Sequence, residues 1–370
     1  MTGTLFETPD IWERLAAEHR PILLWGTGNG ADKILNVCEV RGIPIAGIFA
    51  SDGFVRNRCF RGFPVTSWAE AKKNCGADRP VVLMAFGSSR PEVLENAKRI
   101  ASEAILLSPD VPAFGEGLFT RAFANERRTE IFAARELFSD EESRRIFDLV
   151  LAYKWTGEVS YLWEAVSDPE EIAKNILRPE TIRTYADLGA YVGDTIQKLA
   201  QVAPNLQTVF AMEPDPHSFR KLEAYAAAEE RFRVLPVQAA AWNTEDEVLF
   251  DESGNRNAGA LSNRSAALEN RPAKIRSVRA LPLDRITEAA CVDLIKYDVE
   301  GSEREALEGS RKTILRSFPK LLVSVYHRVD DFFALPLLVQ KHFPAYNRFY
   351  LRRDAGIPAW DLNLWAVKGD

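Results

Sequence analysis

The chain has 370 residues, of which 46% are hydrophobic and 27% charged, as expected for a soluble protein of two globular domains. A net charge of -6 leaves no excess of basic residues for nucleic acid, and no apolar run approaches the roughly 18 residues that a membrane helix needs. The four cysteines and four histidines lack the spacing of zinc ligands, so we predict no metal site and a cytoplasmic protein without nucleic-acid or membrane partners.

Strands and helices are predicted to alternate from Pro21 to Ser108. Three apolar runs that end at turn residues predict strands at residues 21–26, 44–49 and 81–87. Between them, helical periodicity followed by a glycine predicts helices at residues 31–42 and 67–76. This order is typical of βαβ units with a parallel sheet, so we assign residues 1–108 to a small Rossmann-like α/β domain.

A glycine-rich turn follows the first of these strands, in the segment LLWGTGNGAD at residues 23–32. Gly26, Gly28 and Ala31 fit the spacing G-x-G-x-x-G/A of a dinucleotide-binding turn. Asp52 lies about twenty residues further on, where such sites place a ribose-binding acid. One match of this kind is a weak signal, and three interpretations stay open: an NAD site, a nucleotide or nucleotide-sugar site, and a structural or docking domain.

Residues 109–178 are predicted to form a helical connector. Their apolar residues recur at helical spacing, with almost no β-branched runs. Asp140 follows Ser139 and precedes two glutamates, which is the pattern of a helix N-cap with acids in the first turn. We expect this connector to pack against one or both of its neighbours.

Strands and helices alternate again in residues 179–370. Five apolar runs predict parallel strands at residues 182–189, 208–214, 232–239, 292–298 and 321–327. Helices are predicted after the first, second, fourth and fifth of them. Two further runs, 347–353 and 361–368, flank a segment with glycine and proline and predict a hairpin. Five parallel strands closed by an antiparallel hairpin match the seven-stranded α/β sheet of class I methyltransferases.

The second glycine-rich turn differs from the first in its spacing. Asp187, Gly189 and Gly193 follow D-x-G-x-x-x-G, with an acid two residues before the first glycine. This pattern favours S-adenosylmethionine over NAD: the glycines let the backbone approach the cofactor, and the acid can meet the amino group of its methionine part. Glu213 ends the next strand and is placed to accept hydrogen bonds from both ribose hydroxyls.

The segment VDLIKYDVEGSEREALEGS, residues 292–310, resembles the FkbM-type methyltransferase family. The segments ADLGAYVGDT, MEPDPHSFRKL, AAAWNTEDEVLF and LPLDRI share this resemblance, which covers roughly residues 181–370. It implies methylation by S-adenosylmethionine, typically of a hydroxyl on a sugar, glycan or natural product. By position it implies cofactor contacts at Asp187, Gly189, Gly193, Glu213 and Asp298, with Gln238 and Ala239 on the adenine side.

Charged residues at the ends of two central strands predict the catalytic site. Lys296, Asp298 and Glu300 share parity along their strand, and such charges are costly there unless they pair with one another. That Lys296 only neutralises its neighbours stays open. His327 ends the next strand, where a neutral imidazole could take the proton of an acceptor hydroxyl. We predict His327 as general base, Asp298 as its neighbour and Glu300 as the next candidate; a histidine bonded to a nearby loop is the structural alternative.

The helix after these acids is predicted to begin at Ser302. Ser302 and Glu305 fit a capping box, which assigns Glu305 to structure. Glu303 lies in the first turn, where its charge favours the helix dipole.

The sequence as a whole predicts an S-adenosylmethionine-dependent O-methyltransferase with a small-molecule or glycan acceptor. Two other classes of function stay open. One is an NAD or nucleotide-sugar enzyme that works from residues 1–108, with such a ligand as partner. The other is a binding protein that keeps a methyltransferase fold without catalysis. The sequence leaves the oligomeric state open.

Overall fold

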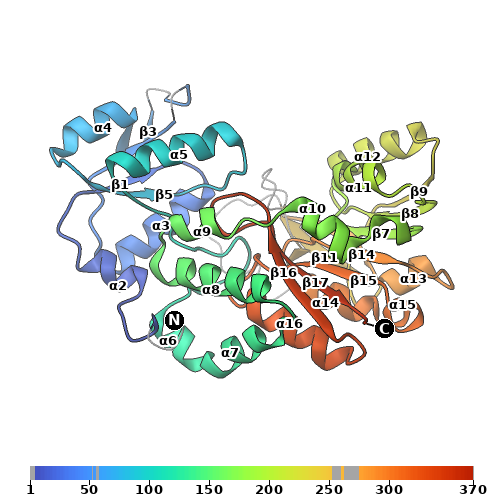
Figure 1. Cartoon of the computed structure of the whole chain (residues 1–370). Coiled ribbons are helices and arrows are strands. Elements are labelled where there is room, and N and C mark those ends of the chain that lie inside the picture. The colour runs from blue at the N-terminus through green and yellow to red at the C-terminus, as the bar shows by residue number, and fades with distance from the viewer. Residues whose placement is uncertain (1–4, 52, 56–57, 252–259, 262–274, 370) are drawn as a thin grey trace.

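The structure is a computed structural model that describes residues 5–51, 53–55, 58–251, 260–261 and 275–369. Two large sheets lie toward opposite ends of the molecule, and helices from the middle of the chain lie between them (Figure 1). No helix in these ranges combines the length and the apolar character needed to cross a bilayer.

The N-terminal part of the chain forms a six-stranded sheet. Its strands are β1 (Ile22–Trp25), β2 (Gly47–Phe49), β3 (Cys59–Phe60), β4 (Phe63–Thr66), β5 (Val81–Met84) and β6 (Ile105–Leu107). Its helices are α2 (Ile11–Ala16), α3 (Asn29–Val40), α4 (Trp68–Cys75) and α5 (Pro91–Glu103). The strand order is β3-β4-β2-β1-β5-β6, and the neighbours are parallel except β3 with β4. Strands β1 and β5 are buried along their whole length, as central strands of a covered parallel sheet are.

Helices dominate the middle of the chain. They are α6 (Arg121–Glu126), α7 (Arg128–Leu137), α8 (Glu141–Thr156), α9 (Ser160–Glu164) and α10 (Pro169–Glu171), followed by a π-helical turn at Ile172–Leu177 and a 3₁₀ turn at Pro179–Thr181. The side chain of Asp140 accepts a hydrogen bond from the backbone N–H of Ser143, which confirms the predicted N-cap of α8.

The C-terminal part of the chain forms a seven-stranded sheet in the order β16-β17-β15-β14-β7-β8-β9. These strands are β7 (Thr184–Leu188), β8 (Thr208–Met212), β9 (Arg233–Val237), β14 (Leu294–Tyr297), β15 (Lys320–Ser324), β16 (Arg348–Arg353) and β17 (Leu362–Val367). Strands β9, β8, β7, β14 and β15 are parallel, and β17 runs antiparallel to both β15 and β16. This arrangement confirms the predicted sheet of five parallel strands with a terminal hairpin.

Six helices accompany this sheet in the described part of the chain. They are α11 (Asp194–Val202), α12 (Pro216–Ala228), α13 (Leu283–Thr287), α14 (Glu303–Gly309), α15 (Arg311–Ser317) and α16 (Asp331–His342). Helices α11 and α12 follow β7 and β8, α14 and α15 follow β14, and α16 follows β15, as the sequence predicts.

A separate four-stranded sheet was not predicted. It contains β10 (Ala240–Ala241), β11 (Asp246–Asp251), β12 (Ala260–Leu261) and β13 (Ile275–Leu281) in the order β10-β13-β11-β12. Val248 and Val278 pair across β11 and β13 and are buried, whereas the neighbouring pair Glu247 and Arg279 is exposed. The period-two pattern is therefore present in the sequence, but it is short and rich in charge.

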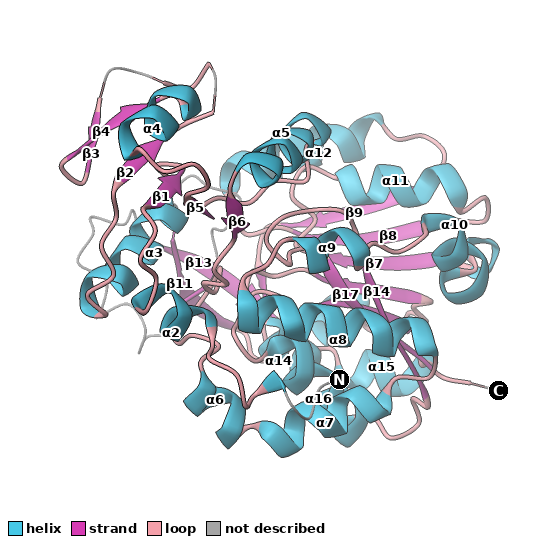
Figure 2. Cartoon of the chain, turned by 60° about the vertical axis from the view of Figure 1, so that its left-hand side comes forward, coloured by secondary structure: helices cyan, strands magenta, loops and turns pink. Residues whose placement is uncertain are grey.

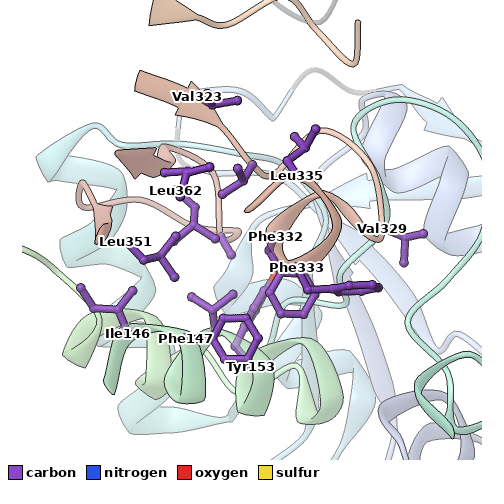
Figure 3. Packing of buried hydrophobic residues seen from close by; sticks show 14 of the residues in the cluster. Ile146, Phe147, Tyr153, Val323, Val329, Phe332, Phe333, Leu335, Leu351 and Leu362 are labelled. Atoms are coloured by element: carbon purple, nitrogen blue, oxygen red, sulfur yellow. The ribbon is translucent and has the colours of Figure 1, made fainter. Parts of the chain in front are cut away.

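The middle helices pack directly on the seven-stranded sheet. Phe147 of α8 lies 5.2 Å from Phe332 of α16 between ring centroids. Figure 3 shows Ile146 and Phe147 of α8 facing Leu351 of β16 and Phe332 of α16. Figure 2 shows α8 in front of β17, with α16 below it. The connector is thus part of the core and is more than a linker.

The two large sheets also meet through loops at their carboxyl ends. Ser88, in the loop after β5, exchanges two backbone hydrogen bonds of 2.8 and 3.1 Å with Ile357, in the loop after β16. A Cβ at Gly87 would overlap the ring of Trp360. The carboxyl ends are where open parallel sheets bind their ligands, so the two candidate binding edges are joined.

Candidate active site

The glycine turn between β7 and α11 lies against the end of β14. Gly189 has a φ of 83°, and a Cβ there would overlap the carbonyl oxygen of Asp298. Gly193 has a φ of 87° and caps α11, and Tyr191 between them is also left-handed, with a φ of 49°. The chain can make this close approach because glycine has no side chain at the contact.

Asp187 is buried behind this turn. Its Oδ2 accepts a hydrogen bond from the hydroxyl of Thr195, and its Oδ1 lies 3.3 Å from Nζ of Lys296. Burial raises the pKa of Asp187, and Lys296 acts against that shift. The side chain has no exposed surface, so the expected direct contact with a cofactor amino group does not fit this geometry. Asp187 instead holds Thr195 of α11 and Lys296 of β14 from behind the turn.

Glu213 lies in front of the turn at the end of β8. Its two carboxylate oxygens each accept one backbone N–H, from Tyr191 and from Asp215, both at 2.8 Å. Each oxygen keeps a second lone pair for a ligand hydroxyl. Burial raises the pKa of Glu213 to about 7. Gln238 is exposed and Ala239 is buried just beyond β9, so these three predicted cofactor residues follow neighbouring strands at one edge.

Lys296 lies between two carboxylates. Its Nζ is 3.3 Å from Asp187 and 3.2 Å from Asp298. Burial alone would lower the pKa of Lys296, but the two carboxylates outweigh it and raise that pKa. Asp298 also accepts hydrogen bonds from Ser324 and Tyr326, at 2.9 and 3.2 Å. These distances agree with the interpretation in which Lys296 neutralises the charges of Asp187 and Asp298.

His327 has no exposed surface and lies among three carboxylates. Its Nδ1 is 2.8 Å from Oε1 of Glu303, and its Nε2 is 3.4 Å from Glu300 and 3.6 Å from Asp298. Burial works to lower the pKa of His327, but the carboxylates outweigh it and raise that pKa to about 10. The imidazole therefore carries its proton at neutral pH, which corrects the expectation of a neutral base.

Glu300 combines a left-handed backbone with a partly exposed carboxyl group. It has a φ of 52°, and its side chain is 25% exposed, so it faces the open side of the cluster. Burial, followed by the charges of Asp298 and Glu303, raises the pKa of Glu300 to about 8 despite the opposing effect of His327. The carboxylate form of Glu300 is therefore a better proton acceptor than His327, whose imidazole already carries its proton.

Glu303 is the residue of this site that sequence reasoning missed. It is buried, and its Oε1 accepts from the backbone N–H groups of Val299 and Gly301 as well as facing His327. The predicted capping box is wrong, because Ser302 makes no side-chain cap bond. The signal in the sequence was an acid directly after the strand-end turn, but only the fold shows that it points inward.

The N-terminal glycine turn is also at the carboxyl end of its sheet. Gly26 has a φ of 120° and packs on the ring of Phe86, and Gly28 is the N-cap of α3 with open space around it. Asp52 lies outside the described residues. The predicted ligand of this turn therefore stays a prediction.

The close packing of helix and strand in that turn is at Gly30, one residue before the motif position Ala31. A Cβ at Gly30 would overlap the backbone oxygen of Ala85 after β5, whereas Ala31 is buried in the core. Gly30 thus has the role that the third position of a dinucleotide-binding turn serves, close approach of helix and strand.

The seven-stranded sheet lies within a region that is similar to known proteins. Residues 187–354 match the family model of the methyltransferase FkbM domain. The crystal structure of a methyltransferase FkbM from Methylobacillus flagellatus KT superposes with a TM-score of 0.67 at 20% identity, and the match covers 98% of this chain and 94% of that one. The likeness of fold thus extends over both large sheets.

Other solved structures match less closely. An rRNA methylase from Streptococcus thermophilus has 13% identity and a TM-score of 0.36, with 55% of this chain and 99% of that chain covered. No curated protein matches the chain.

Proposed function

Because residues 187–354 form a methyltransferase domain of the FkbM type, we propose that this chain transfers the methyl group of S-adenosylmethionine to a hydroxyl oxygen of a sugar, glycan or natural product. One observation supports the proposal that the acceptor atom is an oxygen. Glu300, a partly exposed carboxyl group beside the protonated His327, lies at the edge of the sheet that also carries the glycine turn and Glu213.

The residues at that edge fit the cofactor. The turn at Gly189 brings bare backbone to the surface, and Glu213 presents a carboxylate already oriented by two backbone N–H groups. When bound, S-adenosylmethionine supplies an electrophilic methyl group on a positive sulfur. Gly189, Gly193 and Glu213 would hold it, with Gln238 and Ala239 on the adenine side.

The chain's own part in the transfer is positioning and proton removal. The acceptor oxygen would bond to the methyl carbon as the carbon–sulfur bond breaks, and that electron pair would stay on sulfur. The hydroxyl proton passes to Glu300. His327 and Glu303 hold Glu300 in place, because the imidazolium contacts both carboxylates.

A Glu300→Gln variant tests this assignment. We expect its kcat to fall by about 10²–10⁴, the usual cost of losing a general base, while calorimetry gives a cofactor affinity close to wild type. Turnover of the wild type should rise with pH through about 8, since the carboxylate form of Glu300 is the acceptor. The matched control is Glu308→Gln on the exposed face of α14, which should change neither quantity.

The assay follows release of demethylated cofactor with a panel of hydroxyl compounds. Normal turnover in Glu300→Gln would place the base elsewhere. A wild type that binds S-adenosylmethionine but methylates amines or thiols, and no hydroxyl compound, would overturn the oxygen acceptor. NAD bound to the purified protein would support an enzyme that works from the N-terminal turn. S-adenosylmethionine binding without transfer to any acceptor would support a binding protein without catalysis.

A further inference from the structure

A segment that precedes the methyltransferase domain reaches the turn that carries Glu300. Residues 109–118 follow β6 of the N-terminal sheet and contact Gly301, in the turn after β14, and residues 327–329, after β15. The backbone N–H of Phe114 donates to the carbonyl of His327 at 2.9 Å. The ring of Phe114 packs so closely on Gly301 that a Cβ there would lie 2.6 Å from it. The segment thus contacts the two residues that flank the candidate base in space.

Arg328 closes this contact from the other side. Its guanidinium lies 5.1 Å from the centroid of the Phe114 ring, and its Nε donates to the carbonyl of Gly301 at 2.8 Å. Phe114 itself is buried. The ring is therefore held between the Gly301 turn and a cation, and it has little freedom to move away.

The other parts of the segment are tied down as well. Lys33 of α3, the helix that begins at the N-terminal glycine turn, donates to the carbonyls of Pro112 and Ala113 at 2.9 and 3.1 Å. Asp110 forms a buried ion pair of 2.6 Å with Lys154 of α8. Separating Asp110 from Lys154 would leave an unpaired buried charge, so the ion pair holds this part of the segment on α8.

The turn under Phe114 needs such support. Glu300 has a left-handed φ of 52°, a conformation that is strained for an L-residue and persists only when its surroundings impose it. Glu303 holds the turn from the inside through the N–H groups of Val299 and Gly301. Phe114 covers it from the outside.

We propose that Phe114 is a positioning residue for methyl transfer, which keeps the Gly301 turn in the conformation that places the Glu300 carboxylate beside His327. The methyltransferase site is then completed by a segment outside the matched domain. This inference rests on the proposed function for its kinetic consequence, but its structural content can be measured without any acceptor.

The measurement is the titration of His327 in the full chain, by NMR with histidine-selective isotope labelling. The charged groups facing this imidazole are Glu303 of α14 and Glu300 and Asp298 at the end of β14. Glu300→Gln gives the reference shift for losing one carboxylate. We expect Phe114→Ala to lower the pKa of His327 in the same direction, by roughly one unit, a tenfold loss in proton affinity, because Glu300 moves away.

Three companion variants sharpen the result. Phe114→Leu fills most of the volume and should return the titration close to wild type. Gly301→Ala pushes on the same contact from below and should shift it as Phe114→Ala does, which also serves if Phe114→Ala does not fold. The matched control is Phe123→Ala, which loses ring contacts to Phe119 and Phe333 away from the turn and should leave His327 unchanged.

Kinetics supply the second readout. Phe114→Ala should lower kcat by about 10–100-fold with cofactor affinity within about twofold of wild type, the pattern of a displaced catalytic group. A wild-type titration of His327 in folded Phe114→Ala overturns the proposal. So does a parallel loss of cofactor affinity and turnover. A wild type that transfers no methyl group would remove the proposed function instead, and a shifted titration would still support the role of Phe114.

Discussion

Charged side chains at the binding edge of this protein have partners within the chain. Lys296 is shared by Asp187 and Asp298, and His327 is surrounded by carboxylates. Glu213 differs, because its partners are backbone N–H groups and no cation is within ion-pair distance among the described residues. It is therefore the carboxylate best prepared to bind neutral hydroxyls, and its affinity for them should be sensitive to its own protonation.

Glu213→Gln should weaken S-adenosylmethionine binding. Each ribose hydrogen bond to a charged acceptor contributes roughly 1.5–3 kcal/mol, and glutamine keeps one of the two acceptor oxygens. Calorimetry should therefore show the loss of one such bond, about 10–150-fold in affinity. Because burial places the pKa of Glu213 at about 7, wild-type affinity should fall as the pH drops through that value. The variant should show no such dependence. The exposed control Glu223→Gln on α12 should behave as wild type; equal affinities in all three proteins would remove Glu213 from the site.

The protonated His327 should appear in the stability of the fold. Its pKa of about 10 lies above the roughly 6.5 of an unfolded histidine, so between these values the folded state binds the extra proton. The free energy of unfolding then decreases as pH rises, and the contribution is complete below about pH 6.5. Urea unfolding of wild type and His327→Gln should show an advantage of the wild type that shrinks toward about pH 10. A difference that stays constant over this range would mean that His327 is neutral in the folded state.

Among the single elements, the two strand-to-helix glycine turns differ in packing as well as in glycine spacing. Gly189 is left-handed and touches the backbone of the neighbouring strand. Gly28 begins its helix with an ordinary φ of -102° and has open space where a Cβ would be. The Gly189 position is therefore locked by its sheet, whereas the N-terminal turn tolerates a side chain at Gly28.

Alanine substitution should separate the two turns. Gly189→Ala must relieve an overlap with the Asp298 carbonyl and hold a strained φ, so we expect a loss of more than about 2 kcal/mol in the free energy of unfolding. Gly28→Ala should change it by less than about 0.5 kcal/mol. Denaturant unfolding monitored by circular dichroism measures both. Comparable losses would show that the N-terminal turn is as constrained as the other.

At the scale of the whole molecule, the two large sheets share one core. The largest buried cluster includes Trp25 of β1, Phe147 of α8 and Leu364 of β17, so apolar packing runs from one sheet to the other through the connector. Part of this cluster is shown in Figure 3. The loops that meet at Gly87 and Trp360 add a second contact near the candidate site.

This shared core predicts one cooperative thermal transition for the wild type in calorimetry. Gly87→Ala places a methyl group against the ring of Trp360 and should force the loop after β16 away from the loop after β5. We expect the transition to broaden or split in that variant, and turnover to fall because the two edges separate. Two resolved transitions already in the wild type would show that the sheets unfold independently.

In the C-terminal part of the chain, the elements and their order can be predicted from the amino-acid sequence. Strand periodicity, the turn residues and the D-x-G-x-x-x-G spacing are local, so the seven-stranded sheet and the turn at Gly189 follow from segments of about twenty residues or fewer. The N-cap at Asp140 is local for the same reason. The small sheet around β11 and β13 was missed because its strands are short and charged, which weakens the same signal.

Which charged groups meet, and which of them carry a proton, depends on how distant segments pack together. His327 looks like a base in the sequence, yet three carboxylates from the end of β14 and the start of α14 surround it and keep it protonated. Asp187 looks exposed at a strand end but is buried against Lys296. Phe114 gives no signal in the sequence at all. A pKa and a packing contact depend on burial and on neighbours distant in the chain, and residue spacing along the sequence carries no information about either.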